Sequence, residues 1–171
     1  MRMNLRPLFA ELVTVFSGER AIEGHVRDAL RSAACEVDAP DDAVALPESI
    51  LGVMAQEDAH PICDLVARIP FNWAPPQTSV DPLYVQHSIS KSHVELLGPN
   101  GLVKSDAVRL GLYGMLPHSE YGLRTHPAEE IYVMLAGQVD WKHADLPYVS
   151  HLPGERSYHP SMMPHASRTR G

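Results

Sequence analysis

A short stretch, residues 121–137, gathers side chains that bind metal ions and transfer protons. His126, Glu130 and Tyr132 are separated by even numbers of residues, and Arg124 shares their parity. In an extended chain that turns at the intervening proline, these side chains can point to one side, because successive side chains of a strand alternate between faces. Imidazole and carboxylate groups are ligands of divalent transition metals. The stretch therefore predicts a metal site with a phenol beside it.

A second segment, residues 154–165, supplies a third candidate ligand, His165. The first stretch has a histidine, a glutamate four residues later, and a glycine, Gly137, seven residues beyond that. The second segment has a glycine, a proline six residues later, and His165 five residues after the proline. This two-part spacing resembles the cupin signature. We therefore expect His126, Glu130 and His165 to be the metal ligands.

The sequence around these motifs resembles a narrower group, the cupin dimethylsulfoniopropionate (DMSP) lyases of marine bacteria. The likeness runs from about Trp73 to the C-terminus. Four segments carry it: Val94–Gly101, Arg109–Met115, His126–Val133 and His159–Thr169. The resemblance implies one divalent transition metal ion (Zn, Fe, Mn, Co or Ni) held by the two histidines and the glutamate, with Tyr132 nearby. It also maps a second family tyrosine onto Tyr121.

The activity implied by this resemblance is cleavage of DMSP to dimethyl sulfide and acrylate by β-elimination. A base removes the proton next to the substrate carboxylate, and we expect Tyr121 in this role, with Tyr132 as a ligand or alternative base. A nearby cation is needed, because a free phenol has a pKa of ~10. An aromatic wall would suit the sulfonium group through cation–π attraction. The candidates for that wall are Trp73, Tyr84, Tyr113 and Trp141.

Arg124 departs from the cupin pattern, because it stands where the pattern has its first histidine. A guanidinium stays protonated and cannot ligate a metal. Arg124 either pairs with the substrate carboxylate, or its charge repels the metal and puts the lyase activity in doubt. The sequence favours repulsion, since a guanidinium two residues from a ligand histidine and on the same side lies near the cation. His118 or His159 could supply the missing imidazole.

Two other functions remain open from the sequence. Two histidines and one carboxylate that leave open positions are also the pattern of non-haem iron oxygenases, so an iron-dependent cupin dioxygenase is one alternative. A non-catalytic cupin that binds a small carboxylate or a metal is the other. Oxygen uptake would identify the first alternative.

Composition excludes several classes of partner. The chain has 14 Lys+Arg against 21 Asp+Glu, a formal charge of −7, which argues against nucleic acid. No stretch approaches the ~20 apolar residues of a membrane span, and we expect a cytoplasmic protein. Cys35 and Cys63 lack metal-ligand spacing and are expected to be reduced thiols. The expected partners are a small zwitterionic substrate and a second copy of the chain in a homodimer.

The fold predicted from the sequence is mainly β: a cupin-type β-barrel (a double-stranded β-helix or jelly roll) over residues 71–171, preceded by a helical segment over residues 1–70. Apolar residues at helical spacing predict helices over 7–18, 21–35 and 47–56, the last either ending there or continuing to residue 68. After a proline-rich bridge, short strands begin at about Tyr84. The resemblance implies a further strand pair after the last residue, so the barrel is expected to be short at its C-terminal end. We also expect Asp140, Asp145 and Glu155 to be solvated loop charges.

Overall fold

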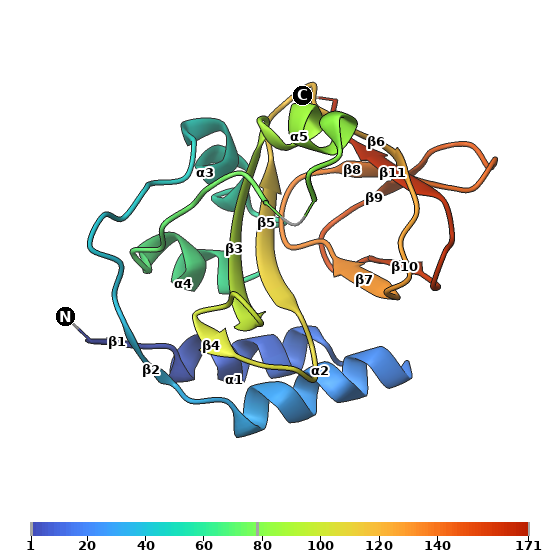
Figure 1. The fold of residues 1–171 in the computed structure, drawn as a ribbon. Helices are drawn as coiled ribbons and strands as arrows, with labels where there is room; N and C mark the ends of the chain where they lie inside the picture. The colour runs from blue at the N-terminus through green and yellow to red at the C-terminus, as the bar shows by residue number, and fades with distance from the viewer. Residues whose placement is uncertain (1, 78, 171) are drawn as a thin grey trace.

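The computed structural model describes residues 2–77 and 79–170. The N-terminal part is built from four helices and a pair of short strands (Figure 1). Their bounds are β1 (Arg2–Asn4), α1 (Arg6–Val15), α2 (Ala21–Ser32), β2 (Glu36–Asp38), α3 (Glu48–Met54) and α4 (Ile62–Arg68). For the third expected helix, the shorter alternative, ending at residue 56, agrees with α3, and the continuation to residue 68 was wrong because residues 62–68 form a separate helix, α4. None of the helices in the described residues has the length and apolar character needed to cross a membrane.

Helix α1 forms because its apolar residues recur on one face. Leu8, Phe9 and Leu12 are buried there, and a proline occupies the first turn, where its missing N–H is not needed. Helix α2 packs against α1 and buries Val26 and Leu30. After α2 the chain enters β2, which pairs antiparallel with β1.

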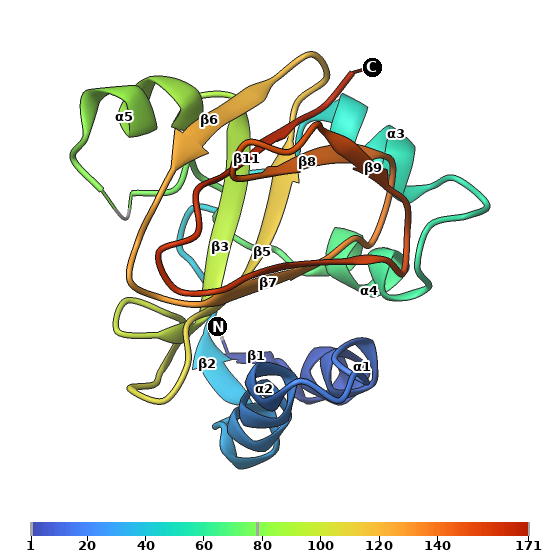
Figure 2. The same ribbon diagram turned by 90° about the vertical axis from the view of Figure 1, so that its right-hand side faces the viewer.

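The remainder of the chain is mainly β strand. Its elements are α5 (Pro82–Ser88), β3 (Lys91–Gly98), β4 (Val103–Lys104), β5 (Leu110–Met115), β6 (Glu120–Arg124), β7 (Glu130–Val133), β8 (Val139–His143), β9 (Val149–His151), β10 (Arg156–His159) and β11 (His165–Arg168). They pair in the orders β4-β3-β5, β6-β11-β8-β9 and β10-β7. Figure 2 shows these sheets curling around a common interior, with β7 and β10 on the side nearest to α1 and α2.

The main core lies between the N-terminal helices and the β3-β5 sheet. Leu96, Leu97 and Leu110 from the sheet belong to one buried cluster with Leu8 and Phe9 of α1. Burial of such side chains contributes about 1.5–3 kcal/mol each relative to leaving them exposed. The helices therefore form one side of the hydrophobic core and cover the outer face of the barrel.

Helix α5 lies where the sequence analysis expected strands to begin. Its N-terminus is capped by Asp81, whose carboxylate accepts hydrogen bonds from the backbone N–H groups of Leu83 and Tyr84, both at 3.0 Å. Pro82 occupies the first helical position, where proline is favoured. The first barrel strand begins at Lys91, and the strand prediction was wrong for residues 84–88.

Asp140 was expected to be a solvated loop charge, and that expectation was wrong. It lies on β8 with only 2% of its surface exposed. Its carboxylate accepts hydrogen bonds from Ser150 Oγ (2.6 Å), Arg168 Nε (3.1 Å) and Arg170 Nε (2.9 Å). These three donors keep the pKa of Asp140 below its ordinary value although burial alone would raise it. The buried charge is thus compensated by the end of the chain.

The N-terminal helices are also bound to the barrel by a buried ion pair. Arg156 at the start of β10 donates from Nε to Glu23 Oε1 at 3.0 Å and from Nη2 to the carbonyl of Val15 at 2.8 Å. Glu23 is 1% exposed and also accepts from the backbone N–H of Gly18 at 3.0 Å. A carboxylate this deeply buried requires such partners.

Candidate metal centre and its pocket

Three of the predicted ligands come together inside the β6–β11 part of the barrel. His126 lies in the β6–β7 loop, Glu130 is the first residue of β7, and His165 is the first residue of β11. Glu130 Oε2 lies 3.1 Å from His126 Nε2 and 3.2 Å from His165 Nε2. One ligand atom from each residue lies within 4.8 Å of the other two. This spacing allows one ion to contact all three residues.

The backbone fixes which nitrogen each histidine presents to the centre. His126 Nδ1 lies 2.9 Å from the carbonyl of Ala128, and His165 Nδ1 lies 2.8 Å from the carbonyl of Met163. A carbonyl only accepts hydrogen bonds, so each Nδ1 carries the proton and each neutral ring presents a lone pair at Nε2. Histidine ligands of metals are commonly oriented by a backbone carbonyl in this way.

The atoms that face the centre are left without hydrogen-bond partners. His126 Nε2, His165 Nε2 and Glu130 Oε2 are all buried and unpaired. Buried polar atoms normally have a partner, and leaving one unsatisfied costs about 1–3 kcal/mol. Two lone pairs and a carboxylate oxygen aimed at one point are the donor set of a divalent transition metal. The residues present therefore fit such an ion.

Glu130 is held in the charged state that ligation needs. Burial alone would raise its pKa, but the surrounding imidazoles of His159, His165 and His126 and the guanidinium of Arg124 together lower the pKa well below its ordinary range. A carboxylate in such surroundings remains ionised at neutral pH.

His159 is a fourth imidazole at this centre. It lies opposite Glu130 in the β10–β7 pairing and is 0% exposed. Its ring stacks on that of His165 with centroids 4.2 Å apart, and its Nδ1 lies 3.8 Å from Glu130 Oε2. His118, the other residue considered as a source of the missing imidazole, is exposed in the turn between β5 and β6.

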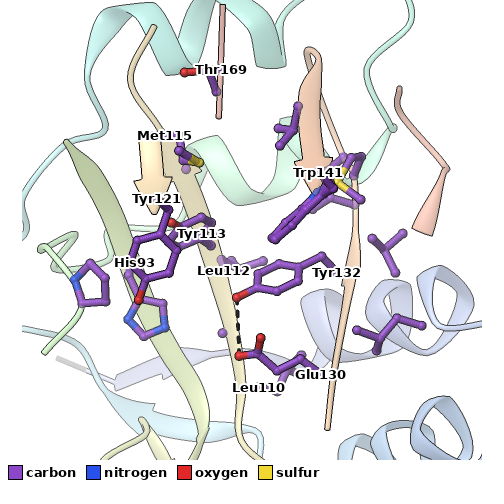
Figure 3. A pocket seen from close by; sticks show the side chains of 18 of the residues that line it. His93, Leu110, Leu112, Tyr113, Met115, Tyr121, Glu130, Tyr132, Trp141 and Thr169 are labelled. Carbon is purple, nitrogen blue, oxygen red and sulfur yellow. Dashed lines mark hydrogen bonds between the residues drawn. The ribbon is translucent and has the colours of Figure 1, made fainter. Parts of the chain in front are cut away.

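Two candidate catalytic phenols lie near this centre, on strands β6 and β7. Tyr132 Oη lies 3.5 Å from Glu130 Oε1. Tyr121 lies under the guanidinium of Arg124, whose Cζ is 3.5 Å from the centroid of its ring. Figure 3 shows the two phenol rings entering the pocket from different sides, with Tyr132 directed at Glu130. Both residues line one cavity of about 1440 Å³.

The two phenols differ in the charges that face them. Burial raises the pKa of Tyr121 above its ordinary value, and Arg124 opposes that rise. Burial also raises the pKa of Tyr132, and the negative charge of Glu130 raises it further. Arg124 also opposes the rise of the Tyr132 pKa, so its charge favours the phenolate form of both residues and does not distinguish them.

The aromatic candidates fall into three groups. Trp141 lies 4.5 Å from Tyr132 and 4.7 Å from His159, centroid to centroid, and Tyr113 lies 6.1 Å from Tyr132. Tyr84 packs edge-on against Tyr121 at 5.7 Å. Trp73 is not part of this ring cluster, because its ring packs edge-on against Phe71 at 5.6 Å. The ring next to the centre is thus Trp141.

Lys91, a residue that the sequence analysis did not identify, lies beside the pocket. It is 3% exposed, and its Nζ lies 3.8 Å from the centroid of the Tyr121 ring and donates to the carbonyl of His87. In the described part of the chain it has no ion pair with a carboxylate. A lysine at the start of a strand is usually solvated, so the sequence carried no signal for its burial.

The fold and the ligand set define a cupin-type β-barrel with a candidate metal centre. A match to the dimethylsulfoniopropionate lyase family covers residues 75–171, more than half of the chain. The chain belongs to this family. It is 38% identical over 74 residues to dimethylsulfoniopropionate lyase DddQ of Ruegeria pomeroyi, an alignment that covers 43% of this chain and only 37% of that relative.

Two solved structures have a similar fold. The crystal structure of DddQ from Ruegeria pomeroyi is 24% identical, with a TM-score of 0.59 over 96% of this chain and 86% of that one. A structure from work on the DMSP lyases RdDddP and RnDddQII is 21% identical, with a TM-score of 0.59 over 96% of this chain and 87% of that one. They confirm the mainly β cupin fold with N-terminal helices.

Proposed function

We propose that the protein is a metal-dependent carbon–sulfur lyase that cleaves DMSP to dimethyl sulfide and acrylate. The observation that carries the proposal is the convergence of His126 Nε2, Glu130 Oε2 and His165 Nε2, all buried and unpaired, in a member of the DMSP lyase family. These three residues would hold one divalent transition metal ion. When bound, the ion would supply positive charge that stabilises the electrons developing next to the substrate carboxylate.

Tyr121 is the proposed base in this reaction. Its phenolate oxygen accepts the proton from the carbon next to the carboxylate, the electron pair of that C–H bond forms the double bond of acrylate, and the C–S bond breaks to release neutral dimethyl sulfide. Arg124 over its ring favours the phenolate. Tyr132 is the alternative base or a ligand, and its contact with Glu130 favours the ligand role.

Aromatic rings beside the centre suit the other end of the substrate. Trp141 and Tyr132 are in ring contact next to His159, and Tyr84 packs against Tyr121. A sulfonium group against such faces gains about 0.5–2 kcal/mol from cation–π attraction. Trp73 lines the same cavity, but its ring packs on Phe71 and not on these rings, so its proposed substrate role has less support than that of Trp141.

Arg124 has two proposed roles, and its position supports one of them. Both Nη atoms are buried without a hydrogen-bond partner, and the guanidinium lies over the Tyr121 ring. A buried guanidinium with free donors is suited to bind a carboxylate bidentately. We therefore propose that Arg124 pairs with the substrate carboxylate, although the sequence alone favoured repulsion of the metal.

The test is direct assay of the purified chain with DMSP after loading with Zn, Fe, Mn, Co or Ni. We expect dimethyl sulfide in the headspace and an equal amount of acrylate in solution. Tyr121→Phe should retain the metal and lose about 10²–10⁴-fold in kcat, the usual contribution of a positioned acid or base. Tyr148→Phe, a change on the half-buried Tyr148 that contacts Arg168, is the matched control. Metal loading without either product would refute the lyase proposal.

The same two histidines and one carboxylate also support a second candidate, an iron-dependent dioxygenase. Oxygen consumption by the Fe-loaded protein with a thiol or small carboxylate substrate, without release of dimethyl sulfide, would favour it. A protein that binds metal or acrylate but turns over neither substrate would be the non-catalytic cupin.

A further inference from the structure

The cupin motif of this chain lacks one imidazole, and the barrel places another beside the gap. Arg124, which stands in the position of the motif histidine, cannot ligate a metal. Arg124 is also the cross-strand partner of His165. An imidazole at position 124 would therefore lie directly beside the predicted ligand His165 in the sheet. His159 reaches the centre from a different strand, β10.

His159 is buried with one nitrogen unaccounted for. Its side chain has no exposed surface, and its Nδ1 has no hydrogen-bond partner although it lies 3.8 Å from Glu130 Oε2. A buried histidine normally has both ring nitrogens paired, because an unpaired polar atom in the interior is costly. This nitrogen is thus in the same condition as the two Nε2 atoms already assigned to the centre.

The other ring nitrogen of His159 belongs to a series of hydrogen bonds. Its Nε2 lies 2.8 Å from Ser157 Oγ, and that oxygen lies 2.9 Å from His143 Nε2. If His159 Nε2 carries the proton, it donates to Ser157, Ser157 donates to His143, and Nδ1 of His159 is left with a lone pair directed at the centre. Each of these two hydrogen bonds then joins one donor to one acceptor.

We propose that Nδ1 of His159 is a third imidazole ligand of the metal, replacing the motif histidine that Arg124 has displaced, and that Ser157 and His143 orient it. The inference rests on the metal centre of the proposed function. With His126, Glu130 and His165 it gives a set of three imidazoles and one carboxylate. An ion of higher coordination number held by this set retains open positions for a substrate.

The test counts imidazole ligands and measures metal affinity, so it does not depend on turnover. X-ray absorption of the Zn- or Co-loaded full chain should give three imidazoles per metal for the wild type and two for His159→Gln. A competition titration with a chromophoric chelator should show at least about a tenfold loss of affinity for His159→Gln. His159→Asn should lose less, because the end of an asparagine side chain lies near the position of Nδ1.

His151→Gln is the matched control, because His151 is on β9 and its Nδ1 already contacts the carbonyl of Val149 at 3.0 Å. Circular dichroism separates a folded variant from an unfolded one, and if His159→Gln fails to fold, the imidazole count of the wild type decides alone. A count of two in the wild type, or full affinity in a folded His159→Gln, overturns the inference. A wild-type chain that binds no metal refutes the metal centre itself.

Discussion

Arg124 and His165 are cross-strand partners in the β6–β11 pairing, so a guanidinium and a predicted metal-ligating imidazole arise from one rung of the sheet. The guanidinium is nevertheless stacked over the Tyr121 ring at 3.5 Å. A permanent cation close to a metal centre requires an anion to compensate both charges. Glu130 is one such anion, and under the proposed function the substrate carboxylate would be the second.

Arg124→Ala is expected to leave bound metal unchanged and to raise KM about tenfold or more with a smaller effect on kcat. The reason is that a contact with the carboxylate is made in both the ground state and the transition state. Steady-state kinetics of acrylate release together with metal analysis measure both quantities. Arg124→His tests the alternative. If this variant binds metal more tightly and is more active than the wild type, the charge of Arg124 weakens metal binding and does not serve to bind the substrate.

His126→Ala is expected to abolish stoichiometric metal binding, because it removes one of the lone pairs that converge on the centre. Metal content after dialysis is the measurement. His118→Ala, which changes an exposed histidine in the β5–β6 turn, should keep the wild-type stoichiometry. Retention of one metal ion per chain by His126→Ala would show that the ligand is another residue.

Ser157→Ala is expected to lower the free energy of unfolding of the metal-free protein by about 1–3 kcal/mol, because it leaves the buried Nε2 of His159 without its partner. Ser167→Ala is a matched control at similar burial, since among the described residues its hydroxyl donates to the sulfur of Met115, a weak acceptor, at 3.7 Å, and the loss of stability should be small. Urea unfolding of the three proteins gives the comparison. Equal losses for the two variants would mean that the His143–Ser157–His159 chain contributes nothing specific.

Lys91 should make the free energy of unfolding rise as the pH rises above about 7. Burial first, and the charge of Arg124 second, lower the pKa of Lys91 to about 7. The unfolded chain, in which the lysine pKa is ~10.4, then binds more protons than the folded chain between the two values. The cost of the buried charge is therefore complete below pH 7 and is relieved as pH rises toward 10.

The test compares urea unfolding of Lys91→Met with the wild type at pH 6, 7.5 and 9. The variant also loses the hydrogen bond to the His87 carbonyl, which adds an offset that does not change with pH. The diagnostic is therefore the slope: the stability of the variant relative to the wild type should fall as pH rises. Lys104→Met, on an exposed lysine of β4, should show no slope. A flat difference for Lys91→Met would mean that its pKa is ordinary.

Much of the architecture was predictable from the sequence because helical and strand periodicities are local signals. The helices of the N-terminal part and the change to strands agree with the structure. Helix α5 was missed because its capping residue, Asp81, and Pro82 were not recognised as a helix start. Asp140 was misplaced because its partners, Arg168 and Arg170, lie about 30 residues away, where no local pattern reaches.

The same distinction between local and long-range signals applies to the candidate site. The convergence of His126, Glu130 and His165 follows from motif spacing, and the structure brings them together. The burial of Lys91 and the orientation of His159 depend on packing between strands that are distant in sequence. Their chemistry could therefore be read only from the folded chain.

The buried pair of Arg156 and Glu23 has a consequence for any attempt to isolate the barrel. The family match begins at residue 75, whereas Glu23 lies in α2 and Arg156 is only three residues before His159. Expression from residue 75 would remove the counter-charge of Arg156 and uncover the leucines of β3 and β5 that pack on α1. Such a fragment would have an aggregation-prone face and a loosened β10 strand. The minimal autonomous folding unit therefore includes the α1–α2 hairpin, and the helices and the barrel should melt in one calorimetric transition.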